Sequence, residues 1–81
     1  PQMLQNTSPI RRDSYLKLLR EIRESADLRQ LDVAERLHVP QSFVSKYESG
    51  ERRLDLLELE LVCKACGIDL LEFAKRFADI S

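Results

Sequence analysis

Residues 28–53 read LRQLDVAERLHVPQSFVSKYESGERR, and this stretch decides the fold. The helical spacing of its apolar residues predicts one short helix over about 30–37 and another over about 41–49. Pro40 disfavours helical geometry in the residue before it, and Gly50 suits the left-handed position that ends a helix. Because only about three residues separate the two helices, they must cross steeply, at roughly 90–120°, as in a helix-turn-helix.

The second of these helices has two unlike faces. At about 100° per residue, Val44 and Tyr47 share the inward face, with Glu48 beside them. The opposite face holds short polar side chains and one cation, which suit the base edges of a major groove. A polar face is, however, more often simply solvated. The outward residues are Ser42, Ser45, Lys46 and Ser49, flanked near the N-terminus by Gln41 and Phe43.

Three further helices are predicted outside this stretch. The first runs over about 9–26, because Pro9 suits a first helical position and apolar residues recur at three- and four-residue intervals. These residues are Tyr15, Leu16, Leu19, Ile22 and Ala26. Asp55 followed by Glu58 is typical of a helix start, and the helix should end at Gly67. Asp69 and Glu72 repeat this device for a last helix that runs to about Ala78.

We therefore expect an all-α fold, a compact bundle of five helices around a central helix-turn-helix at about 30–49. Eighty-one residues are enough for one domain only. We assign residues 9–81 to that domain and residues 1–8 to a flexible N-terminal arm.

The stretch resembles the Xre family of helix-turn-helix proteins, which are similar to phage repressors and Cro. Members typically read T-Q-x-x-L-A-x-x-x-G-V-S-x-x-x-I-S-x-x-E-x-G-x-R. The matching residues here are Gln30, Val33, Ala34, Val39, Val44, Ser45, Glu48, Gly50 and Arg52, with Arg23, Leu28, Gly67 and Asp69 in flanking positions. The resemblance covers about 16–77 and implies a lambda-repressor-like fold and sequence-specific DNA binding in transcriptional regulation.

Three positions depart from the family pattern. Arg29 replaces the usual Thr or Ser cap, and Pro40 replaces the second cap. His38 stands where the family has the turn glycine, although His is among the residues that tolerate a positive φ. These departures concern the local geometry of the turn more than the function.

The resemblance also implies roles for individual side chains. The base-facing set would be Gln41, Ser42, Phe43, Ser45 and Lys46, with Phe43 meeting a thymine methyl group. The phosphate-facing set would be Arg29, Gln30, Ser49, Arg52 and Arg53. Family members commonly pair an arginine of the first helix with the glutamate that ends the third, which implies a structural ion pair between Arg23 and Glu48.

Charge and hydropathy narrow the class of protein. The net charge of −1 divides into +2 over residues 1–53 and −3 over residues 54–81. Phosphate contact depends on the local field of one face, so this total is compatible with DNA as a partner. No apolar run approaches the roughly 18–20 residues that span a bilayer, and the N-terminus lacks the order of a secretory signal. We expect a cytoplasmic protein with no membrane partner.

No motif supports an enzyme or a cofactor. Cys63 and Cys66 have C-x-x-C spacing, but a structural zinc needs four ligands, and His38 is the single histidine. We interpret both cysteines as small core residues, with redox sensing as the alternative. His38 has no evident carboxylate or nucleophile partner and is interpreted as a turn residue.

The last helix carries more apolar groups than one face requires. Besides its main stripe, Leu71 and Ala78 extend a second one, which predicts either a homodimer surface or a wide core face. A dimer would suit two half-sites about 34 Å apart. The alternative function is a protein-interaction module, such as the antitoxin of a toxin–antitoxin pair. We expect no small-molecule ligand domain in a chain of this length.

Overall fold

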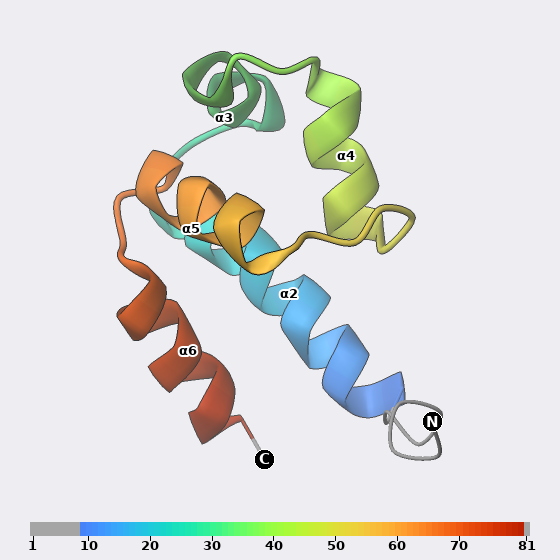
Figure 1. Ribbon diagram of the computed structural model, residues 1–81, viewed down its shortest axis with the longest axis vertical. Coiled ribbons are helices and arrows are strands. Elements are labelled where there is room, and N and C mark those ends of the chain that lie inside the picture. The colour runs from blue at the N-terminus through green and yellow to red at the C-terminus, as the bar shows by residue number, and fades with distance from the viewer. Residues whose placement is uncertain (1–8, 81) are drawn as a thin grey trace.

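The computed structural model describes residues 9–80, so the predicted arm over 1–8 lies outside the described residues. The described chain forms the helices α2 (Pro9–Ser25), α3 (Gln30–Leu37), α4 (Gln41–Ser49), α5 (Leu56–Ala65) and α6 (Leu70–Asp79). Helix α2 runs through the molecule, with α3 and α4 towards one end and α6 towards the other (Figure 1). The predicted five-helix, all-α fold is confirmed. Within residues 9–80 no helix is both long and apolar enough to cross a membrane.

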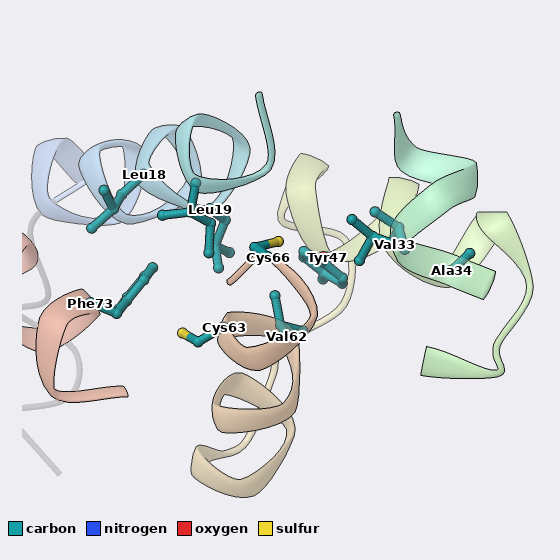
Figure 2. Close-up of a cluster of buried hydrophobic side chains, with 11 residues drawn as sticks. Leu18, Leu19, Val33, Ala34, Tyr47, Val62, Cys63, Cys66 and Phe73 are labelled. Carbon is teal, nitrogen blue, oxygen red and sulfur yellow. The ribbon is translucent and has the colours of Figure 1, made fainter. Parts of the chain in front are cut away.

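One continuous apolar core joins all five helices (Figure 2). Its largest fully buried side chain is Tyr47, which lies between α3 and the end of α5. One expectation was wrong: Ala26 follows the end of α2 in a turn and is exposed, whereas Leu18 is buried. The core residues are Leu18, Leu19, Ile22, Val33, Ala34, Val44, Tyr47, Val62, Cys63, Cys66 and Phe73.

The turn between α3 and α4 takes the form that the sequence allows. His38 adopts φ 58° and ψ 45°, the left-handed conformation that ends α3. The backbone N–H of Val39 then donates to the carbonyl of Ala34 at 3.0 Å, which satisfies one of the last carbonyls of the helix. Pro40 is extended at φ −64°, and α4 begins directly after it.

Helix α6 is fastened to the first half of α2. Tyr15 packs edge-on against the rings of Phe73 and Phe77, with ring centroids 6.1 and 6.0 Å away. The guanidinium of Arg11 lies 3.9 Å from the Phe77 ring centroid and donates to the backbone carbonyls of Phe77 and Ile80. These contacts close the molecule at the end opposite to the helix-turn-helix.

Candidate nucleic-acid interface

Helix α4 presents a polar face to solvent because its apolar side chains anchor it from behind. Val44 and Tyr47 are 0% and 1% exposed. The residues that the sequence places on the outer face are all exposed: Gln41, Ser42, Ser45, Lys46 and Ser49. This face carries neutral donors and acceptors and one cation, and no acid, so a phosphate-lined groove would not repel it.

The inner face of α4 contains one unsatisfied polar atom. The hydroxyl of Tyr47 is buried and has no hydrogen-bond partner among residues 9–80. Burial raises the pKa of Tyr47 above its usual range, so the hydroxyl stays protonated. Tyr47 therefore acts as a packing residue behind the exposed face.

Phe43 lies differently from its polar neighbours on α4. It is half-buried, and its ring meets the ring of Tyr47 edge-on, with centroids 5.8 Å apart. The guanidinium of Arg52 covers the ring of Phe43 at 4.4 Å. Phe43 thus joins α4 to the following loop, and only part of its surface is open to a base.

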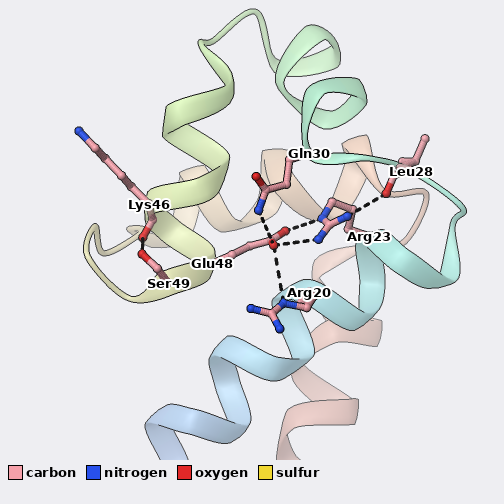
Figure 3. Close-up of polar contacts among 7 residues, drawn as sticks. All are labelled: Arg20, Arg23, Leu28, Gln30, Lys46, Glu48 and Ser49. Atoms are coloured by element: carbon pink, nitrogen blue, oxygen red, sulfur yellow. Dashed lines mark hydrogen bonds and ion pairs between the residues drawn. The ribbon is translucent and has the colours of Figure 1, made fainter.

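A buried carboxylate connects three helices (Figure 3). Glu48 of α4 accepts from Arg23 of α2 through two bonds, Nε to Oε2 at 2.6 Å and Nη2 to Oε1 at 3.0 Å. Arg23 also donates to the carbonyl of Leu28 at 3.0 Å. The two side chains are 12% and 2% exposed, and the hydrogen bond with Glu48 raises the pKa of Arg23. The implied Arg23–Glu48 ion pair is present in this geometry, which sets α4 at a fixed angle to α2.

Gln30, the first residue of α3, points to the same carboxylate. Its Nε2 donates to Glu48 Oε1 at 3.1 Å. The sequence suggested only a phosphate contact for this side chain and missed the bond to Glu48. No local pattern could reveal it, because 18 residues separate the partners.

The cation before α3 is partly neutralised. Arg29 is 74% exposed and pairs with Asp32 at 2.8 Å. Asp32 also accepts from the backbone N–H of Arg29 at 2.7 Å, and Arg29 lowers the pKa of Asp32 to about 2, chiefly through their side-chain hydrogen bond. Arg29 makes no cap bond with its own side chain, as expected of a residue without an acceptor.

The two neighbouring arginines of the loop after α4 have different surroundings. Arg52 forms a two-bond pair with Glu58 of α5, at 2.8 and 3.2 Å, and this pair lowers the pKa of the Glu58 carboxyl. Arg53 is exposed. Ser49 is also exposed, and its hydroxyl donates to the carbonyl of Lys46 at 3.0 Å. Arg53 and Ser49 are thus open to solvent, whereas Arg52 is engaged within the protein.

Exposed leucines lie on α5 and α6, besides Leu31 of α3 at 42% exposure. On α6, Leu71 is 78% exposed, and Ala78 is exposed as well. On α5, Leu56, Leu57 and Leu61 are 66%, 71% and 55% exposed. The sequence singled out the α6 residues and missed those of α5, because the leucines of α5 follow one another without a clear polar face.

Cys63 and Cys66 are free thiols within the core. They are 0% and 4% exposed. Burial raises the pKa of each thiol to about 11. Among residues 9–80 no three His, Cys, Asp or Glu side chains are grouped to hold a metal ion.

The comparisons with known proteins agree with this geometry. The model of a helix-turn-helix family, HTH_3, matches residues 19–73. A solved structure described as an XRE-family like protein from Pseudomonas syringae pv. tomato str. DC3000 is 36% identical in sequence. The match covers 99% of this chain and 94% of that one, with a TM-score of 0.83. No curated protein matches. The chain therefore belongs to the XRE family of DNA-binding helix-turn-helix regulators.

Proposed function

We propose that this protein is a sequence-specific transcriptional repressor that binds its operator as a homodimer in the cytoplasm. The observation that carries the proposal is the exposed face of α4, backed by buried Val44 and Tyr47. Gln41, Ser42, Ser45 and Lys46 would meet base edges, joined by the open part of Phe43. Arg29, Gln30, Ser49, Arg52 and Arg53 would face the phosphates on either side of the groove.

The buried ion pair supports this assignment. A base-reading helix must be held at a set angle, because hydrogen bonds to base edges depend on direction and distance. Arg23 and Glu48 provide this constraint from behind the helix, at a depth that water reaches poorly. The polar face is therefore presented by a rigid support.

Selection of bound fragments from a random duplex pool, followed by binding isotherms on the selected site, tests the proposal. We expect one enriched sequence with two-fold symmetry. Lys46→Glu should abolish binding to it, because the new carboxylate would face the groove. Arg53→Glu should weaken binding to all duplexes and lower the salt slope. Lys75→Glu on α6 is the matched charge reversal, since Lys75 is exposed away from α4, and it should bind like the original chain.

A second candidate function rests on the exposed side chains of α6. If the chain is an antitoxin, Leu71 and Ala78 would form the surface that binds its toxin. A chain that enriches no duplex but forms a stable complex with a co-expressed protein, lost on Leu71→Glu, would favour this function over DNA reading.

A further inference from the structure

Arg20 adds positive charge to the junction of α2, α3 and α4. Its Nε lies 4.0 Å from Glu48 Oε1, and its side chain is 58% exposed. The same carboxylate already holds Arg23 through two short bonds. Two guanidinium groups therefore share one carboxylate, and Arg20 is the more exposed of the two. Because Arg20 is exposed and distant from its partner, leaving Glu48 would cost it little.

Arg20 and Gln30 reach the same oxygen from different helices (Figure 3). Gln30 Nε2 lies 3.1 Å and Arg20 Nε 4.0 Å from Glu48 Oε1, so the two nitrogens are at most about 7 Å apart. Charge-assisted hydrogen bonds to phosphate oxygens are about 2.8 Å long. The amide of Gln30 has a second N–H beside the one that Glu48 accepts, and the guanidinium of Arg20 is exposed, so each side chain can offer a donor to one of the two free oxygens of a phosphate group.

The surface around Arg20 continues to the residues that the proposed function places against DNA. An open hollow of about 290 Å³ lies between α2 and the end of α4, lined by Asp13, Leu16, Lys17, Arg20, Glu48 and Ser49. The exposed charges in this hollow are the cations Lys17 and Arg20 and the carboxylate of Asp13. Ser49 belongs to the predicted phosphate-facing set, so the hollow joins that set to α2. The start of α3, where backbone N–H groups are free of helical partners, adds a positive dipole on the side of Gln30.

We propose that Arg20 and Gln30 together bind one phosphodiester of the DNA backbone, with Arg20 turning away from Glu48 to do so. The contact extends the DNA surface beyond the helix-turn-helix and onto α2. This inference rests on the proposed function. Glu48 keeps the two bonds from Arg23 when Arg20 leaves, so the orientation of α4 is preserved.

The test is Arg20→Gln, measured on the selected duplex and on a duplex of random sequence across a salt series. Because a phosphate contact carries no sequence information, affinity should fall by a similar factor for both duplexes. The slope of log affinity against log salt should decrease by about one unit. Arg20→Lys keeps the charge and should restore the slope. Lys75→Gln removes one charge from α6 and should leave the slope unchanged.

Several outcomes would overturn the inference. An unchanged salt slope for Arg20→Gln, on a duplex that the original chain binds, would show that Arg20 makes no phosphate contact. A loss confined to one base position would assign it to base reading. A drop in unfolding midpoint as large as that of Arg23→Gln would assign it to the buried pair. Failure of the original chain to bind any duplex would instead refute the proposed function.

Discussion

At the scale of single residues, one carboxylate organises the end of the molecule that carries the helix-turn-helix. Glu48 is nearly inaccessible to water, and it takes hydrogen bonds from Arg23 and Gln30. A buried charge is tolerated only where its partners satisfy it, so the loss of one partner is costly even when the intact pair contributes little. Both the stability of the protein and the orientation of α4 therefore depend on Glu48.

Arg23→Leu should destabilise the protein by about 3 kcal/mol, towards the lower end of the range for a broken buried pair. The value is not larger because Gln30 and Arg20 remain beside Glu48. Urea denaturation measures the change. Arg76→Leu is the control, since Arg76 pairs with Glu72 on the surface at 43% and 44% exposure, and it should cost less than about 0.5 kcal/mol. Equal costs for the two variants would contradict the importance of burial.

Gly50→Ala should cost more than Gly67→Ala. Both glycines have a positive φ, +85° and +84°, so both variants suffer the backbone strain of roughly 1–2 kcal/mol. A Cβ at position 50 would also lie 2.9 Å from Leu16 Cδ1, whereas one at position 67 would meet nothing within 4 Å. We expect a difference of about 1 kcal/mol in thermal unfolding. Equal unfolding temperatures for the two variants would show that the Leu16 side chain moves aside at no cost in stability.

At the scale of helices, short signals at the ends of each element determine where it begins and stops. Asp55 accepts from the backbone N–H of Glu58 at 2.8 Å, and the Glu58 carboxylate accepts from the N–H of Asp55 at 3.0 Å. At the start of α6, Asp69 accepts from Glu72 at 2.7 Å, but the Glu72 carboxylate pairs with Arg76 instead. Helix α5 therefore has the reciprocal cap, and α6 has half of it.

Asp55→Ala should destabilise the protein by about 1 kcal/mol, because the first turn of α5 loses its acceptor. Asp55→Asn keeps an acceptor oxygen and should lose less. Chemical denaturation of both variants measures the difference. Similar losses in the two would mean that the carboxylate charge, and not the hydrogen bond, stabilises the helix start.

Local signals explain how much of this fold could be read from the sequence. The sequence predicts the bounds of α3 and α4 correctly, because Pro40 restricts the backbone before α4 and Gly50 readily adopts the left-handed conformation that ends it. Contacts between distant residues, such as Gln30 with Glu48, depend on how helices pack and left no local pattern. The same holds for the exposure of Leu57, which depends on which side of α5 meets α3 and α6.

At the scale of the whole molecule, the two proposed surfaces lie apart. Helix α4 is towards one end, and α6 is fastened along α2 towards the other (Figure 1). A partner bound on α6 would therefore leave the polar face of α4 uncovered. This arrangement would let one chain bind DNA through α4 and a second copy of the chain through α6 at the same time.

Leu71→Glu should convert the proposed dimer to a folded monomer, because it places a charge on a side chain that is 78% exposed and so has little to do with the core. Sedimentation equilibrium measures the mass, and circular dichroism checks the fold. Leu57→Glu is the matched variant on α5, at 71% exposure, and should stay dimeric. If Leu57→Glu dissociates the dimer and Leu71→Glu does not, the dimer interface lies on α5 and not on α6.

The two sequestered thiols have a practical consequence. Only a thiolate reacts readily with iodoacetamide, and both sulfur atoms are shielded from solvent within the native core. Their alkylation must therefore wait for a transient opening of the region where α5 ends and α6 begins. The rate at which the protein gains the mass of the alkyl group in native buffer should report how often that region opens. The two cysteines can therefore serve as built-in probes of local unfolding.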